Sequence, residues 1–161
     1  MAAQTSPAFL ATIDADLAGR SGPPADAALE RVIARLGCAL GTIHLLDRAD
    51  GSLHLRASKD LPPAVIERVQ RIPIGKGMAG LAAERREPVQ VCNLQQEQVV
   101  VRPGAKETKA EGSIACPMLF GTELMGVLGV AKRVPYDFNA EEIDLLMDVG
   151  RHIARALAQN T

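Results

Sequence analysis

The segment Arg71–Val91 constrains the fold of this chain more than any other stretch. Its sequence, RIPIGKGMAGLAAERREPVQV, runs from a short extended piece into a turn of two glycines around a lysine. Gly75 and Gly77 suit backbone angles that other residues resist. Pro73 places the extended piece at the edge or end of a sheet. A helix is predicted from Met78 to Arg86. The segment therefore predicts a strand, turn, helix and second strand that cover one side of a sheet.

Two helices and a hairpin are predicted before this segment. The first helix opens at Ser6-Pro7 and ends in a stretch rich in glycine and proline, and the second runs from about Ala25 to Gly37. Apolar strands Cys38–Asp47 and Ser52–Ser58 then flank the sequence RADG. An Asp-Gly pair between two such strands is a strong hairpin signal.

The carboxy-terminal half predicts a second hairpin and a closing helix. A long polar stretch, Asn93–Gly112, precedes strands Ser113–Phe120 and Leu124–Lys132. Long connections of this kind in compact domains tend to be functional, so we expect this one to cover a ligand. Asn139 and Glu142 have the spacing of a capping box for the last helix. The pattern as a whole predicts one α+β domain.

Composition excludes several functions. The 18 basic and 19 acidic side chains nearly cancel, and only 2% of residues are aromatic, which disfavours nucleic-acid binding. The three cysteines lack a Cys-x-x-Cys pair, and the amino terminus does not resemble an export signal. No stretch is apolar enough to span a membrane. We therefore expect a cytoplasmic protein with reduced thiols.

Four stretches in register resemble the GAF domain, a small-molecule sensor module. They are TIHLLDRADGSLHLRAS, IPIGKGMAGLAAERREPVQV with its I-x-x-G-x-G-x-x-G turn, SIACPMLFGTELMGVLGVAK, and FNAEEIDLLMDVGRHIARAL. The resemblance covers about Ala25–Leu157, so we divide the chain into an N-terminal helix and linker (1–24) and a GAF domain (25–161). It implies a mostly antiparallel sheet of five or six strands. Terminal helices would lie on one face, and short helices and loops would close a pocket on the other.

The same resemblance implies a non-enzymatic sensory protein whose ligand is unidentified. Some stand-alone GAF proteins sense nitrate at helix-terminal amides, so a small anion is one possibility, bound by the helix that follows Gly77. Ala131 replaces the asparagine of the cyclic-nucleotide signature, which disfavours such a ligand. The predicted ligand-binding residues are Met78, Ala79, Val91, Asn93, Arg102, Ser113, Ile114 and Cys116.

An enzymatic alternative comes from the cysteines. Free methionine-(R)-sulfoxide reductases are stand-alone GAF enzymes whose thiolates attack the sulfoxide. Cys116 and Cys92 are the candidate catalytic residues in that alternative. The family's cysteine after the glycine turn is replaced here by Met78-Ala79.

Histidines raise the question of a metal or haem. His44 and His54 would lie side by side on one sheet face if the hairpin pairs symmetrically about Ala49. Zinc needs a third protein ligand, which the sequence does not supply, and His152 adds no evident haem site. No metal or cofactor is therefore predicted.

The predicted partners are a small molecule, a second copy of the chain and a signalling protein. Two amphipathic terminal helices suit a homodimer that pairs them in a bundle. Ligand bound beneath Asn93–Gly112 would favour one arrangement of loop and helices. The remaining alternative is a dimerisation or interaction module without a ligand.

Overall fold

The computed structural model describes residues 7–18, 24–96 and 108–159. Six antiparallel strands form one sheet in the order β3-β2-β1-β6-β5-β4. The strands are β1 (Leu40–Asp47), β2 (Ser52–Lys59), β3 (Arg71–Pro73), β4 (Val89–Val91), β5 (Ser113–Phe120) and β6 (Glu123–Ala131). The predicted α+β class and antiparallel sheet are confirmed, and β3 is an edge strand, as Pro73 indicates.

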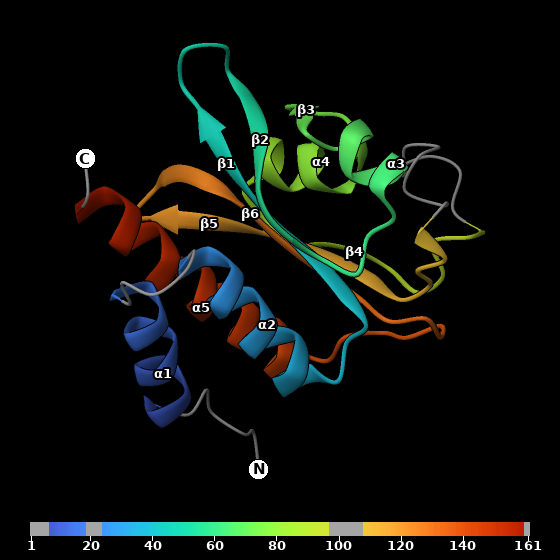
Figure 1. The fold of residues 1–161 in the computed structure, drawn as a ribbon, viewed down its shortest axis with the longest axis horizontal. Coiled ribbons are helices and arrows are strands. Elements are labelled where there is room, and N and C mark those ends of the chain that lie inside the picture. Colours follow the sequence, from blue (N-terminus) through green and yellow to red (C-terminus); the bar gives the residue numbers. More distant parts are fainter. Residues whose placement is uncertain (1–6, 19–23, 97–107, 160–161) are drawn as a thin grey trace.

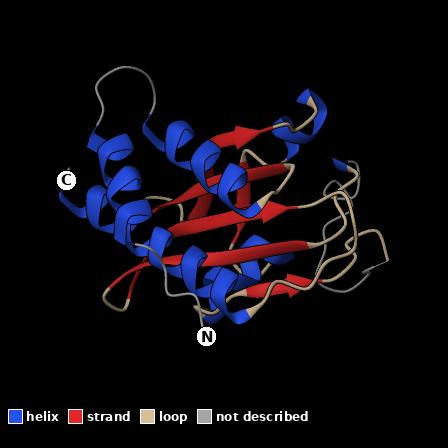
Figure 2. Ribbon diagram, turned by 90° about the horizontal axis from the view of Figure 1, so that it is seen from below, coloured by secondary structure: helices blue, strands red, loops and turns tan. Residues whose placement is uncertain are grey.

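Helices cover both faces of this sheet (Figures 1 and 2). One face carries α1 (Pro7–Ala18), α2 (Pro24–Leu36) and α5 (Ala140–Gln159), and the other carries α3 (Pro63–Arg68) and α4 (Gly77–Arg85). The two-sided arrangement expected from the resemblance is therefore present. Among the described residues, none of the helices has the length and apolar character needed to span a bilayer.

The larger core lies between the sheet and α1, α2 and α5. It includes Ile43, Cys116 and Leu128 from the sheet and the fully buried Ile13 from α1. In α5, Leu145, Val149 and Gly150 are among the buried residues, while Ile143, Met147 and Leu157 are half-buried. An added Cβ on Gly150 would lie 3.3 Å from Met118, so α5 lies close against β5.

The start of α5 has the predicted capping box. The Asn139 side chain accepts a hydrogen bond of 2.9 Å from the Glu142 amide, and Glu142 accepts one of 3.0 Å from the Asn139 amide. Two amides without intrahelical partners are thereby satisfied. Glu142 also accepts a hydrogen bond of 2.7 Å from the Tyr136 hydroxyl, which fixes the entry of the chain into the helix.

The glycine turn before α4 has the backbone that its sequence predicts. Gly75 and Gly77 have φ of +89° and +67°. The third glycine of the motif, Gly80, serves a different purpose, because an added Cβ would lie 2.5 Å from the Pro73 carbonyl oxygen. Gly75 also donates to the Gly80 carbonyl at 2.8 Å. The motif thus joins strand β3 tightly to helix α4.

Candidate functional site

A cavity of about 330 Å³ lies between the sheet and helices α3 and α4. Its floor consists of residues from β1, β5 and β6, and its walls come from α3, the segment before β3 and the start of α4. Leu94, Thr108 and Ala110, which flank the undescribed residues 97–107, also line it. The cavity therefore occupies the side of the sheet that the glycine turn was predicted to cover.

Strand β1 contributes alternate side chains to the cavity. Leu40, Thr42 and His44 line it, whereas Ile43 is buried in the opposite core. This alternation follows from the two-residue period of a strand. The sequence reasoning did not assign β1 to the site, although a histidine and a threonine at alternating positions of an otherwise apolar strand are a usable signal.

His44 is the most buried polar residue of the site, with 2% of its surface exposed. Its Nε2 nitrogen lies 2.8 Å from the carbonyl oxygen of Val69, at the carboxyl end of α3. Its Nδ1 nitrogen is buried without a hydrogen-bond partner in the described part of the chain. Burial lowers the pKa of His44, and the hydrogen bond to Val69 opposes this effect. The imidazole is therefore neutral at pH 7.

The amino end of α4 forms another wall. Lys76 is the N-cap residue and supplies no side-chain cap, and Gly77, Met78 and Ala79 line the cavity. The first amides of a helix lack intrahelical partners and carry partial positive charge. Arg68 and Lys76 are the charged residues among the described lining residues, and both are cationic. This wall therefore suits an anionic group.

The predicted ligand-binding residues divide between this cavity and other places. Met78, Ala79, Ser113 and Ile114 line it, while Arg102 lies outside the described residues. Val91 is on edge strand β4 and is not among the lining residues. The Asn93 side chain instead accepts a hydrogen bond from the Gln95 amide at 3.1 Å, which forms a local turn.

No cysteine lines the cavity, and all three thiols are free. Ala115 lines the cavity, and neighbouring residues of a strand point to opposite faces, so Cys116 lies on the side of β5 that faces the helices. Burial raises the pKa of Cys116 to about 12 and that of Cys38 to about 11. Cys92 is exposed after β4. The two candidate catalytic thiols, Cys116 and Cys92, thus lie outside the cavity.

The predicted side-by-side placement of His44 and His54 is wrong. In the hairpin, His44 pairs with Leu55 and His54 pairs with Leu45, with a register shift between Ile43 and His44. Paired residues share a face and neighbours along a strand do not, so the two histidines lie on opposite faces. A one-residue difference in register from pairing about Ala49 is enough to separate them.

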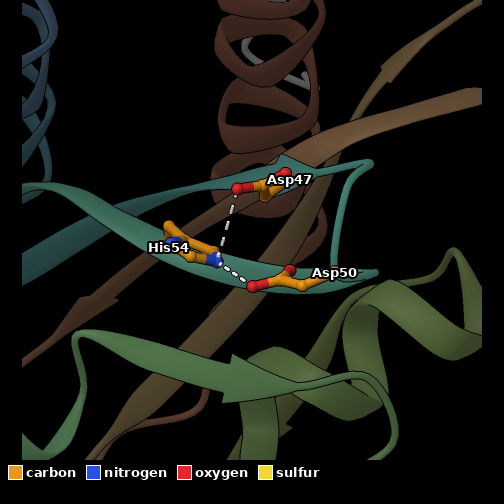
Figure 3. A group of neighbouring side chains, drawn as sticks. All are labelled: Asp47, Asp50 and His54. Atoms are coloured by element: carbon orange, nitrogen blue, oxygen red, sulfur yellow. Dashed lines mark hydrogen bonds and ion pairs between the residues drawn. The ribbon is translucent and has the colours of Figure 1, made fainter.

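His54 instead belongs to a cluster at the tip of the hairpin (Figure 3). One ligand atom each from Asp47, Asp50 and His54 falls within a span of 4.8 Å, and His54 Nε2 is 2.7 Å from Asp50 Oδ2. Asp50 also accepts hydrogen bonds from the hydroxyl and amide of Ser52, which lower its pKa. The Arg71 guanidinium lies 3.4 Å from the same carboxylate and already supplies positive charge there. The cluster therefore stabilises the turn.

His152 is also separate from the other histidines. Its Nδ1 lies 2.8 Å from Asp14 Oδ1, so it connects α5 to α1. The three histidines, all within the described residues, occupy the cavity floor, the hairpin tip and the helical layer, and no two of them share a site.

Comparisons with known proteins agree with this geometry. A family model described as a GAF domain matches residues 25–158. A search of curated protein sequences gives no significant match. The solved GAF domain of a phosphoenolpyruvate-protein phosphotransferase from Coxiella burnetii has a TM-score of 0.81 at 21% identity, covering 94% of this chain and 92% of its own.

Solved enzymes are similar as well. Free methionine-R-sulfoxide reductase from Neisseria meningitidis, in complex with its substrate, has a TM-score of 0.74 at 16% identity and covers 100% of both chains. The reduced form of the corresponding protein from Staphylococcus aureus has a TM-score of 0.64 at 20% identity, covering 92% of this chain and 94% of its own. At such identities these likenesses establish the fold, which regulatory domains and reductases share.

Proposed function

The chain belongs to the GAF domain family, and from this premise we propose that it is a non-enzymatic sensor that binds a small anionic molecule in the cavity between the sheet and helices α3 and α4. The observation that carries the proposal is a largely apolar cavity whose charged lining residues in the described part of the chain, Arg68 and Lys76, are both cationic. Ligand sites typically combine an apolar lining with a small number of placed polar groups.

The charge of the lining supports an anion. Lys76 and the amino end of α4 present positive charge, Arg68 lines the cavity from α3, and the described lining residues include no carboxylate. A helix amino terminus favours a negative group through its free amides and its dipole. A carboxylate or similar group fits this wall.

The volume of the cavity favours an organic anion over nitrate. About 330 Å³ lies at the lower end of the range for sites that enclose a small organic ligand. Nitrate, with four heavy atoms, would leave most of this space unfilled. Val65, Ile72 and Val127 offer apolar contacts to the body of a larger molecule.

The placement of the thiols favours binding over catalysis. A sulfoxide reductase needs a thiolate beside its substrate, whereas Met78 and Ala79 occupy the turn at the cavity and the three cysteines lie elsewhere. Support for the reductase alternative comes from the similarity of this fold to the solved reductases.

Output through the terminal helices completes the proposed function. α1 and α5 lie on the other side of the sheet from α3 and α4 (Figure 1), and Phe9, Leu10 and Met147 are only partly buried there. Partly buried apolar side chains on two adjacent helices suit contact with a second copy of the chain, which would then present a surface to a signalling partner.

A ligand screen with a matched pair of variants tests the binding proposal. Native mass spectrometry of freshly purified protein would detect a co-purified molecule, and a thermal-shift panel of aromatic and aliphatic carboxylates would follow. A binder at 100 times its Kd should raise Tm by about 5–10 °C. Ala79→Phe, which fills the cavity, should abolish the shift, and Ala64→Phe, on the exposed side of α3, should keep it.

The contrary result is equally defined. If no carboxylate raises Tm and no molecule co-purifies, the result supports the alternative of an interaction module without a ligand. Retention of the full shift in both variants would place binding outside the cavity.

A further inference from the structure

The hydrogen bond between His44 and Val69 determines which tautomer of the imidazole is present. The partner of Nε2 is a backbone carbonyl oxygen, 2.8 Å away, and such an oxygen can only accept. Nε2 therefore carries the proton. A neutral imidazole has a single N–H group, so the second nitrogen, Nδ1, is a hydrogen-bond acceptor.

This acceptor lacks a donor within the described residues. Nδ1 is buried and unpartnered, although buried polar atoms in folded proteins are almost always hydrogen-bonded. The His44 side chain lies on the cavity face of β1, between the sheet and α3. The missing donor is therefore best supplied by a molecule that occupies the cavity.

We propose that His44 is a ligand-recognition residue whose Nδ1 accepts a hydrogen bond from an N–H or O–H group of the bound molecule. This inference rests on the proposed function and narrows its ligand class. The occupant is a small organic anion with an apolar body, an acidic group at the α4 wall and a hydrogen-bond donor that reaches His44. An anion without a donor, such as nitrate, leaves Nδ1 unpaired.

Access to Nδ1 requires only a local change. The atom itself is covered in this structure, whereas other parts of His44 line the cavity. The terminal torsion of a histidine ring has a broad energy minimum, so a small rotation can turn Nδ1 toward an occupant. The partner of Nε2, Val69, is the C-cap residue of α3, a six-residue helix that buries one side chain, Val65.

Two probes that differ by the methylation of one hydroxyl group test the inference. 4-Hydroxybenzoate and 4-methoxybenzoate share a carboxylate and an aromatic ring, but methylation removes the O–H donor. Titration calorimetry on the wild-type protein should give 4-hydroxybenzoate about a tenfold lower Kd, since an unpaired buried acceptor is costly. His44→Gln keeps an N–H group for Val69 but has no acceptor at the position of Nδ1, so the preference should disappear. His44→Asn keeps an acceptor near the position of Nδ1 and should retain it in part.

Nuclear magnetic resonance of ¹⁵N-histidine-labelled protein gives a readout that a purely structural residue would not change. The free protein should show His44 as the Nε2–H tautomer, and only 4-hydroxybenzoate should shift its Nδ1 resonance. His54 and His152 provide internal references. This readout uses the wild-type chain and so decides the matter even if a His44 variant does not fold.

Each outcome has a separate meaning. Equal Kd values for the two probes with an unmoved Nδ1 resonance, or an Nδ1–H tautomer in the free protein, overturn this inference and leave the anion-binding proposal standing. If neither probe binds and the wider carboxylate panel fails as well, the proposed function falls and the inference with it.

Discussion

The imidazole of His44 hydrogen-bonds to the carbonyl oxygen of Val69 at 2.8 Å, and this contact joins β1, one of the two central strands, to the end of α3. α3 has six residues and buries one side chain, Val65. So short a helix is not stable by itself and depends on tertiary contacts. The same histidine thus supports a wall of the cavity and contributes to its lining.

We expect His44 to make stability depend on pH. Burial holds the pKa of His44 below its ordinary value of 6.5, so below about pH 6.5 the unfolded chain binds a proton that the folded chain does not. The free energy of unfolding should therefore decrease as the pH is lowered below about 6.5. This group can contribute a decrease of at most about 1.4 kcal/mol per pH unit. Urea unfolding of wild type and His44→Gln between about pH 5 and 8 measures the difference.

The pH dependence of the variant serves as the control for the other titrating groups. His44→Gln should lose less stability than wild type on acidification, because glutamine does not titrate. Parallel curves for the two proteins would show that the folded state binds the proton as readily as the unfolded state does.

Gly80 should tolerate alanine poorly. Within a helix, replacing glycine by alanine ordinarily stabilises by about 0.5–1 kcal/mol. Here the new Cβ would lie 2.5 Å from the Pro73 carbonyl oxygen, and a backbone atom cannot move aside as a side chain can. We expect Gly80→Ala to lower the free energy of unfolding by about 1–3 kcal/mol.

Gly129→Ala is the matched comparison. Its Cβ would lie 3.4 Å from the Thr42 hydroxyl oxygen and 3.7 Å from the Ile114 carbonyl oxygen, which are ordinary contacts. Urea unfolding should therefore place this variant near wild type. Equal losses in the two variants would mean that the close approach of β3 and α4 is not what restricts Gly80.

Much of the fold follows from local sequence signals, and the site follows only in part. The Asp-Gly turn, the proline in β3 and the Asn139–Glu142 capping box each act within a few residues, so their consequences are readable without a structure. The glycine turn likewise predicted that Met78 and Ala79 would lie beside a cavity.

The remaining features depend on register and on contacts between distant segments. A difference of one residue in the β1–β2 pairing places His44 and His54 on opposite faces of the sheet, with His44 on the face that carries the cavity. The partner that fixes its tautomer, Val69, is 25 residues away in the sequence. The face taken by Cys116 also depends on which neighbours cover β5. Strand register and the face on which a side chain lies depend on packing across the whole sheet, so the sequence of a single segment does not predict them.

The thiols should differ strongly in reactivity. With a pKa of about 12, Cys116 has about one thiolate in ten thousand molecules at pH 8, and Cys38, with a pKa of about 11, has about ten times more. Iodoacetamide at pH 8 should therefore modify the exposed Cys92 first, followed slowly by Cys38. Peptide mass spectrometry over time measures the order.

Two conditions check this ordering. Raising the pH from 8 to 9 should speed modification of Cys38 about tenfold, since its thiolate fraction rises in that proportion. Cys116 should react only when the protein is unfolded in urea. Labelling of Cys116 at the rate of Cys92 in native buffer would contradict its burial beneath the helices.

Reductase activity is expected to be absent. The chemistry requires a thiolate at the substrate, and the described cavity is lined by Met78 and Ala79 at the glycine turn and by no cysteine. Wild type with dithiothreitol should consume free methionine-(R)-sulfoxide no faster than a variant in which Cys38, Cys92 and Cys116 are all serine. The Neisseria meningitidis reductase, assayed alongside, shows that the conditions support turnover. Faster consumption by wild type than by the triple variant, lost again in Cys116→Ser or in a separate Cys92→Ser variant, would identify the chain as an enzyme and reject the sensor proposal.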